Sequence, residues 1–262
     1  MAQQVSKEKR CGEVYSNLWE HYKGNLFADY CKWLWYEVNQ YDVWLDPELE
    51  GKIVLDAGFG SGRAIAAILN AGAEKVYGID ISPKNEAIAK ENLSPWISKV
   101  NLKTGSVLDL PYDDEFFDVV HCYGVLHHTS NPRKGYDELV RVLKTDGVLF
   151  IALYSKGGLV NHVLNFFRFF TTRGFPPFGA MKAFSRAIFG EDKNHFWYAI
   201  LDGLYAPYRE TYTEKELRDW LDSTGIKNVS RYYCSWSYYK WPKLLSGKDR
   251  GLIILKGYKR KV

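Results

Sequence analysis

The feature that most constrains this chain of 262 residues is a short apolar run that ends in an acid and passes directly into three alternate glycines. The segment is VLDAGFGSGR, residues 54–63, with the acid at Asp56 and the glycines at Gly58, Gly60 and Gly62. Glycine is needed where the backbone takes a positive φ or lies against a ligand with no Cβ between them. Three glycines within five residues exceed what an ordinary turn requires, so the segment predicts a strand followed by a nucleotide-binding loop.

The position of the third glycine indicates which nucleotide the loop suits. A dinucleotide-binding loop places its third glycine three residues after the second, so that a pyrophosphate can rest on the helix N-terminus. Here Arg63 holds that position, at the start of a helix predicted over residues 63–71, and Gly62 comes one residue earlier. The charge of Asp56 would also repel phosphates, whereas it can accept a hydrogen bond from an ammonium group. The loop therefore favours S-adenosylmethionine over NAD.

Further apolar runs place more polar residues at strand ends. The second run ends at Asp80, 18 residues after Gly62, where an acid can accept hydrogen bonds from both ribose hydroxyls. We expect Ile81, the next residue, to line the same ligand. A third run, residues 100–104, leads into Gly105-Ser106-Val107, and a fourth leads through Tyr123 to His127 and His128. A fifth covers residues 139–154.

The order and the residues of these five motifs resemble those of the class I S-adenosylmethionine-dependent methyltransferases. The resemblance is to the small-molecule group in particular, which is similar to ubiquinone/menaquinone-biosynthesis C-methyltransferases. The resemblance covers residues 52–154. It implies an α/β fold with a Rossmann-like sheet of seven strands, six parallel and one antiparallel, and S-adenosylmethionine as the cofactor. It also implies a contact of Asp56, Ala57 and the three glycines with the methionine end, of Asp80 with the ribose, and of Ser106 and Val107 with the adenine.

Two positions depart from the family pattern. The family usually has an acid where this chain has Ser106, and a hydroxyl accepts a weaker hydrogen bond from the adenine amino group because it carries no charge. Asp109 could compensate, although an acid in such a loop more often stabilises a turn. The segment Lys144–Gly147 replaces a Lys-Pro-Gly-Gly turn, a change that we expect to be structural only.

The pattern divides the chain into four parts. We predict an N-terminal helical lid (1–50), a cofactor-binding core (51–154), an acceptor-binding helical insert (155–210) and a C-terminal helix with a β-hairpin that completes the core (211–262). Within the core, Ser82 and Pro83 mark a helix start. Thr213 and Glu216 form a capping box, with Gly225 as the stop.

The lid and the insert contain the candidate acceptor residues. Aromatic residues at helical spacing fill residues 13–45, and Tyr15 and Trp19 could stabilise a sulfonium by cation–π attraction or only dock the helix. Tyr22, in the same segment, is a candidate for acceptor binding. At the end of the insert, Tyr205 and Arg209 lie in a loop punctuated by proline and glycine, and such loops often carry function.

The insert leaves several interpretations open. In residues 159–170 the polar side chains share one narrow helical stripe, which fits a helix buried against the core or a partner subunit, or an acceptor pocket or lid that touches lipid. Residues 155–196 hold six Lys or Arg and two acids. Such a segment suits an anionic membrane surface, and equally a phosphate or carboxylate on a substrate.

Methyl transfer needs little machinery, because the sulfonium carries its own leaving group and the main task is to align the nucleophile. A base is needed only where the acceptor loses a proton, and His127 and His128 are the candidates. One of them could equally cap or pack the following helix. Tyr123 lies where acceptors approach, and it could contact the methyl group, donate to the acceptor or pack over the cofactor, so we count it with both the catalytic and the cofactor residues.

Composition narrows the function. Hydrophobic residues make up 46% of the chain, which is enough for a large core, and the net charge of +4 comes with no recognisable nucleic-acid module. The four cysteines are widely spaced, which favours a reducing compartment and argues against a structural zinc site. The polar start lacks an apolar signal core, so we expect a cytoplasmic protein. Residues 121–124 read HCYG, where enzymes that methylate adenine or glutamine amino groups have an Asn/Asp-Pro-Pro motif. The sequence therefore argues against those two activities.

The sequence thus predicts transfer of a methyl group from S-adenosylmethionine to a small hydrophobic or aromatic molecule by in-line displacement, with no metal and no nucleic acid. One alternative is an enzyme that meets a quinone or lipid at the membrane surface. Another is a catalytically silent cofactor-binding subunit. Peripheral membrane contact and a homodimer formed through the insert both remain open at this stage.

Overall fold

The computed structural model describes residues 2–19, 49–156, 159–189, 203–232 and 252–261. Within these residues the chain forms one sheet of seven strands in the order β3-β2-β1-β4-β5-β7-β6. The strands are β1 (Ile53–Ala57), β2 (Lys75–Asp80), β3 (Val100–Thr104), β4 (Phe117–Tyr123), β5 (Leu143–Tyr154), β6 (Ile226–Tyr232) and β7 (Leu252–Lys259). The central strands are covered on both faces, which explains why their sequences are nearly continuous apolar runs.

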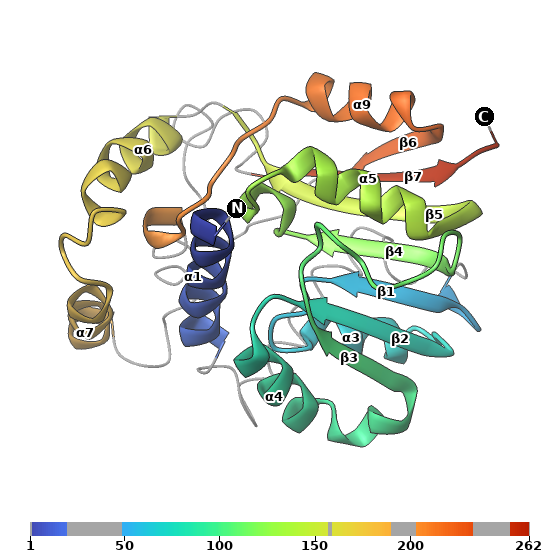
Figure 1. Ribbon diagram of the computed structural model, residues 1–262, viewed down its shortest axis with the longest axis horizontal. Helices are drawn as coiled ribbons and strands as arrows, with labels where there is room; N and C mark the ends of the chain where they lie inside the picture. The colour runs from blue at the N-terminus through green and yellow to red at the C-terminus, as the bar shows by residue number, and fades with distance from the viewer. Residues whose placement is uncertain (1, 20–48, 157–158, 190–202, 233–251, 262) are drawn as a thin grey trace.

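Six strands run parallel, and β7 runs antiparallel to both of its neighbours, β5 and β6. The arrowheads in Figure 1 show this reversal at the edge of the sheet. The predicted sheet composition is therefore confirmed, as is the antiparallel pair at the end of the chain. The sequence pattern predicts the first strand of that pair over residues 229–237; in the structure it begins at Ile226, three residues earlier, and residues 233–237 lie outside the described residues.

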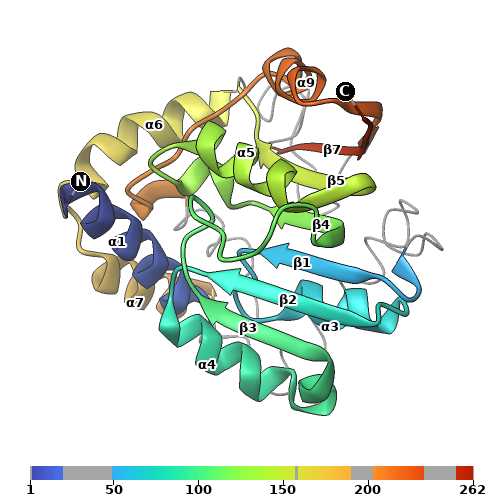
Figure 2. The same cartoon turned by 45° about the vertical axis from the view of Figure 1, so that its right-hand side comes forward.

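The helices lie on both faces of the sheet and beyond its carboxyl end. They are α1 (Ala2–Trp19), α3 (Arg63–Asn70), α4 (Pro83–Asn92), α5 (Pro132–Val142), α6 (Leu159–Thr171), α7 (Phe178–Phe189) and α9 (Glu214–Ser223), with short 3₁₀ turns η2 (Ser94–Lys99) and η3 (Leu126–His128). Figure 2 shows α4 alongside the edge strand β3 and α1 across the end of the sheet.

Two apolar cores hold the layers together. On one face α5 and α9 bury Tyr136, Leu139 and Leu217 against the sheet. On the other face α3 buries Ile65 and Ile68. This arrangement leaves the loops at the carboxyl ends of the parallel strands free to form a site, as is general for open α/β sheets.

The local start and stop signals read from the sequence are confirmed. Ser82 caps α4 by accepting a hydrogen bond from the Asn85 backbone, and Thr213 and Glu216 form the capping box of α9. The fifth predicted run combined two elements, because residues 139–142 are the last turn of α5 and only Leu143 onward is strand. Amphipathic spacing and a buried strand look alike over four residues.

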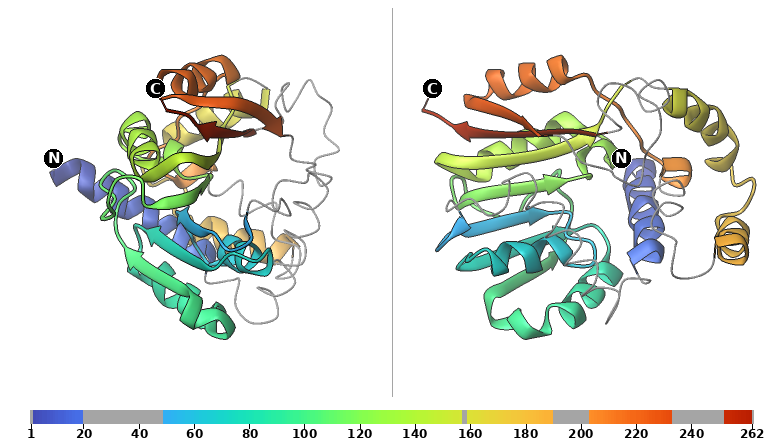
Figure 3. Two further views of the ribbon diagram at one scale, coloured as in Figure 1. Left: turned by 90° about the vertical axis from the view of Figure 1, so that its right-hand side faces the viewer. Right: turned by 180° about the vertical axis from the view of Figure 1, so that it is seen from behind.

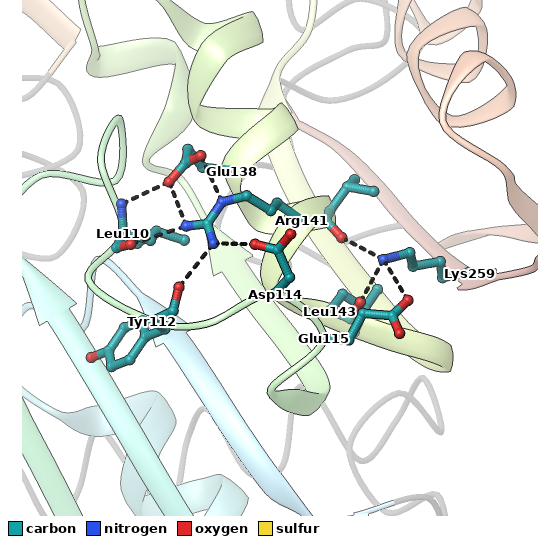
Figure 4. Close-up of polar contacts among 9 residues, drawn as sticks. Leu110, Tyr112, Asp114, Glu115, Glu138, Arg141, Leu143 and Lys259 are labelled. Carbon is teal, nitrogen blue, oxygen red and sulfur yellow. Dashed lines mark hydrogen bonds and ion pairs between the residues drawn. The ribbon is translucent and has the colours of Figure 1, made fainter.

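A network around Arg141 fixes the end of α5 against the loop that follows β3 (Figure 4). Its guanidinium donates to both carboxylate oxygens of Glu138, to the carbonyls of Leu110 and Tyr112, and to Asp114. The hydrogen bonds from Arg141 hold the pKa of Glu138 below its ordinary value. These contacts lie far from the strand ends that carry the glycine loop, so their role is structural.

Helices α1, α6 and α7 stand beyond the carboxyl end of the sheet, with α1 between the sheet and the other two (Figures 1 and 3). Val14 of α1 packs with Leu204 and Tyr205, and Leu164 of α6 and Phe178 of α7 pack against this cluster. We call α1, α6, α7 and residues 203–209 the cap. In the described part of the chain, every helix is too short or too polar to cross a bilayer.

Candidate functional site

The loop after β1 turns through three glycines with positive φ, namely Gly58 at 90°, Gly60 at 54° and Gly62 at 85°. A Cβ on Gly58 would lie 2.1 Å from Cγ2 of Val125, and one on Gly62 would lie 2.8 Å from Cδ1 of Leu93. Backbone conformation and packing therefore require two of these glycines whether or not a ligand is present.

Asp56 ends β1 beside this loop and pairs with a histidine that sequence reasoning did not select. Its Oδ1 accepts a hydrogen bond of 2.7 Å from Nδ1 of His121, and both side chains are almost fully buried. The sheet register places the two residues opposite each other on β1 and β4. His121 also stacks on Phe150 of β5 at 5.2 Å between ring centroids, which fixes the plane of its ring.

The second carboxylate oxygen of Asp56 supports a cationic ligand. Oδ2 is buried and has no hydrogen-bond partner among the described residues. A buried carboxylate oxygen without a donor is costly, and a ligand ammonium group would supply that donor. The glycine loop beside it presents backbone rather than side chains. These residues therefore fit the amino acid end of S-adenosylmethionine.

Asp80, at the end of β2, is held by three protein donors. Oδ2 accepts from the backbone N–H of Gly60 at 3.0 Å, and Oδ1 accepts from Ser82 N and Asn85 Nδ2, both at 2.9 Å. Burial raises the pKa of Asp80, although these hydrogen bonds oppose the shift. Since each carboxylate oxygen has two lone pairs, Oδ2 keeps one for a ribose hydroxyl. Asp80 thus joins the glycine loop to the ribose position.

The loop after β3 places the predicted adenine residues at the same edge of the sheet. Ser106 is half-buried, and its hydroxyl accepts a hydrogen bond of 3.2 Å from the backbone of Leu108. Val107 is buried in the core. A serine that stabilises its own turn still has acceptor capacity, so the adenine contact of Ser106 remains a prediction.

Helix α1 connects the loops after β2 and β4. Near its C-terminal end Ser16 and Ser82 share a hydrogen bond of 2.5 Å, and a Cβ on Gly12 would lie 2.8 Å from Cγ2 of Ile81. Toward its other end Glu8 accepts hydrogen bonds from the backbone and hydroxyl of Ser130. The helix begins at Ala2, earlier than the predicted aromatic segment, and lies beside the end of β2 that carries Asp80.

The two histidines after β4 have different tautomers, as assigned from their hydrogen bonds. Nδ1 of His128 lies 2.7 Å from the carbonyl oxygen of Tyr208, so Nδ1 donates and Nε2 holds the lone pair. Nδ1 of His127 instead accepts from the backbone N–H of Tyr154 at 3.3 Å, which leaves the proton on Nε2. Only His128 thus presents Nε2 as a base.

His127 is fully buried, and burial holds its pKa well below the ordinary value. Its ring stacks on Tyr154 at 3.9 Å, and its Nε2 has no hydrogen-bond partner among the described residues. The neutral ring is therefore a hydrogen-bond donor rather than a base, which argues against the catalytic role that the sequence left open for it.

Arg209 joins this cluster from the end of the insert. Its guanidinium lies 4.9 Å from the ring centroid of Tyr154, and Nη1 donates to Asn165 of α6 at 3.3 Å. The backbone N–H of Glu210 donates to the carbonyl of His127 at 2.9 Å, which holds the loop in place. Arg209 and the two histidines are therefore brought together at the ends of β4 and β5.

The remaining predicted residues are distributed as follows. Tyr15 of α1 contacts His128 edge-on at 5.1 Å. Tyr123 is half-buried at the end of β4 and stacks on His121 at 6.3 Å. Tyr205 is buried in the cap, and its hydroxyl donates to the Pro176 carbonyl, which indicates packing rather than acceptor contact.

Two of the predicted residues cannot be placed. The backbone of Trp19 belongs to α1, but its side chain lies outside the described residues, as does the whole of Tyr22. Sequence reasoning also missed His121 and Tyr154. The available signal for both was their position, since each is a polar or aromatic residue near the carboxyl end of a core strand that carries other site residues.

Known proteins resemble the part of the chain that carries this site. The model of the Methyltransferase domain family matches residues 55–151. A demethylmenaquinone methyltransferase from Clavibacter sepedonicus is 35% identical over 40% of this chain and 42% of its own length. A tRNA U34 carboxymethyltransferase from Hahella chejuensis is 35% identical over 50% of this chain and 40% of its own. The chain thus spans less than half the length of these curated relatives.

The fold has a similar solved counterpart. An S-adenosylmethionine dependent methyltransferase from Mesorhizobium loti superposes with a TM-score of 0.53 at 16% identity, covering 82% of this chain and 94% of its own. The match over residues 55–151, the sheet order and the glycine loop give the core of this chain the features of a class I methyltransferase domain. The cofactor of that class is S-adenosylmethionine, and the geometry of Asp56 and Asp80 fits it.

Proposed function

We propose that the chain transfers the methyl group of S-adenosylmethionine to a small hydrophobic or aromatic acceptor. The observation that carries this proposal is the buried, unpartnered Oδ2 of Asp56 beside the glycine loop, in one strand-end site with Asp80. A cationic amino acid end and a ribose together are the chemistry that these two carboxylates suit. The bound cofactor supplies the activated methyl group.

The protein residues bind and orient the reactants. Asp56, held by His121, accepts from the ammonium group, and Asp80 accepts from the ribose. Helix α1 lies beside the same edge of the sheet, where it can shield the reactants from water (Figure 1). Because the leaving group is already present, alignment of the acceptor with the methyl group supplies most of the acceleration.

His128 can remove a proton from an acceptor that must lose one. Its Nδ1 donates to the Tyr208 carbonyl, so Nε2 is the nitrogen that takes up the proton. Tyr15 and Tyr154 line the same cluster with aromatic faces. Arg209 adds a cation near these faces, which suits an acceptor that carries a phenolate, enolate or carboxylate.

The relatives are named for different kinds of acceptor, so the proposal has to choose between a small molecule and a nucleic acid. One relative is named as acting on demethylmenaquinone and another on tRNA U34. The aromatic cluster around His128 favours the small molecule, because a nucleic-acid acceptor also needs a basic surface that follows the phosphate backbone. A membrane-dissolved acceptor differs from a freely dissolved one only in how it reaches the cluster.

The test is radiolabelled methyl transfer from S-adenosylmethionine to a panel of phenols, quinols, carboxylic acids and bulk tRNA. The proposal predicts turnover with a small aromatic or hydrophobic acceptor, lost in His128→Ala when the acceptor must be deprotonated. Turnover with tRNA alone would contradict it. A chain that binds the cofactor and methylates nothing in the panel would support the silent-subunit alternative.

A further inference from the structure

Helix α6 is amphipathic with its apolar face pointing outward. Its inward stripe is Leu164, Arg168 and Thr171, spaced three and four residues apart. Arg168 donates to the Gly203 carbonyl at 2.8 Å, and Thr171 donates to the Leu204 carbonyl at 2.6 Å. Leu164 and these two hydrogen bonds attach α6 to residues 203–205, while most of its large apolar side chains face outward, the reverse of a helix that packs by its apolar face.

The outward face of α6 and the neighbouring part of α7 expose large apolar side chains. In the described part of the chain, seven of the eight exposed large hydrophobic residues lie here, and we call them the Phe surface. They are Val163, Phe166, Phe167, Phe169, Phe170, Phe175 and Phe184. Phe166 packs edge-on against Phe167 and Phe170, so these rings form a continuous patch. Exposed apolar patches of this kind mark interaction sites.

The segment that carries the Phe surface is basic. Residues 159–189 contain four Lys or Arg and no Asp or Glu, of which Arg168 faces inward, and Glu191 and Asp192 follow in the sequence. Arg173 is exposed, and its guanidinium lies 3.8 Å from the ring centroid of Phe169, within the patch. A bilayer with anionic lipids is apolar inside and negatively charged at its surface. A patch of phenylalanines beside a cation complements both of these properties.

We propose that the Phe surface docks the protein on a membrane that contains anionic lipids. The phenylalanines enter the boundary between head groups and acyl chains, and Arg173 contacts the anionic head groups. Helices α6 and α7, which carry the Phe surface, lie on the far side of α1 from the sheet (Figures 1 and 3), so docking leaves the core domain clear of the bilayer. This docking requires no methyl transfer, and its failure is therefore distinguishable from failure of the proposed function.

The test measures binding of the full chain to vesicles by co-sedimentation, with phosphatidylcholine alone and with a phosphatidylglycerol mixture. The wild type is expected to bind the anionic vesicles strongly, less at high salt, and the neutral vesicles weakly. The double variant Phe166→Ser/Phe167→Ser should lower the partition coefficient by about a hundredfold, since each lost ring removes roughly tenfold. Arg173→Gln should weaken binding to anionic vesicles only.

Ile97→Ser is the matched control, because Ile97 is similarly exposed but lies in η2, away from the cap. It should bind as the wild type does. If Ile97→Ser reduces binding equally, or if the wild type ignores anionic vesicles, the proposal is wrong. It is also wrong if light scattering shows a dimer that Phe166→Ser/Phe167→Ser dissociates, since the surface then belongs to a second copy. Should the double variant misfold, Phe175→Ser gives the same comparison from the loop between α6 and α7.

Discussion

Oδ1 of Asp56 and Nδ1 of His121 lie 2.7 Å apart across the neighbouring strands β1 and β4, and both side chains are nearly inaccessible to solvent. The carboxylate can only accept, so the histidine donates. This hydrogen bond fixes the carboxylate and leaves Oδ2 for a ligand. We therefore expect His121 to be a positioning residue, which acts on the cofactor through Asp56.

Replacing His121 should weaken cofactor binding in proportion to the donor that is lost. His121→Leu removes the donor and should raise the Kd for S-adenosylmethionine about tenfold, as expected for one hydrogen bond to a charged group. His121→Asn keeps an N–H near the same place and should recover most of the affinity. Calorimetry on both folded variants checks this. Equal affinities for the Leu and Asn variants would mean that His121 only fills space.

Asp80→Ala should weaken S-adenosylmethionine binding by roughly 2 to 3 kcal/mol, because it removes a charged acceptor of hydrogen bonds. The variant should also melt at a lower temperature, since Gly60 and Ser82 lose the acceptor for their backbone N–H groups. The ribose role is isolated by titrating the wild type with 2′,3′-dideoxy cofactor. If the wild type binds that compound as tightly as S-adenosylmethionine, the predicted contact of Asp80 with the ribose is wrong.

The pH dependence of stability should report the buried ring of His127. Its pKa in the folded protein lies well below that of the unfolded chain, so the unfolded chain takes up a proton first as the pH falls. The free energy of unfolding is therefore not reduced by this ring above about pH 6.5, and it falls as the pH drops below that value. Between pH 7.5 and 5.5 the wild type should lose about 1 kcal/mol more unfolding free energy than His127→Gln.

Urea denaturation at the two pH values measures this difference. An unchanged pH dependence in His127→Gln would show that this ring titrates normally in the folded state.

Arg209→Ala should reduce kcat/KM for the acceptor about tenfold through loss of its cation near the aromatic cluster. The Kd for S-adenosylmethionine should stay within about twofold, because the cofactor residues lie on other strand ends. Tyr205→Phe is the contrasting variant. It loses the hydroxyl that donates to Pro176 and should lower the melting temperature while leaving turnover unchanged. Steady-state kinetics with thermal unfolding of both variants decide the assignment.

Residues whose role depends on local chain geometry were predictable from the sequence. The strand ending at Asp56, the positive φ of the glycine loop and the caps at Ser82 and Thr213 each follow from contacts within a few residues. The seven-stranded sheet with one antiparallel strand followed from the resemblance, because strand pairing joins residues far apart in the chain.

Relations between distant elements were not predictable in the same way. The pairing of Asp56 with His121 depends on the register of two strands that are 65 residues apart. The different tautomers of His127 and His128 depend on the carbonyl of Tyr208 and the backbone of Tyr154, which no motif near the histidines encodes. The periodicity of α6 indicated an amphipathic helix, but only tertiary contacts show that Arg168 faces inward while the phenylalanines face outward.

The most direct measurement of the central claim is calorimetric titration of the purified chain with S-adenosylmethionine, S-adenosylhomocysteine and NAD, repeated with Gly60→Val. Gly60 has a positive φ and donates its N–H to Asp80, so a branched Cβ would strain the loop and occupy the cofactor's place. The account predicts that the wild type binds the first two ligands at one site, that NAD does not bind, and that the folded variant binds none of the three. Unchanged affinity in Gly60→Val, or tighter binding of NAD than of S-adenosylmethionine, would contradict it.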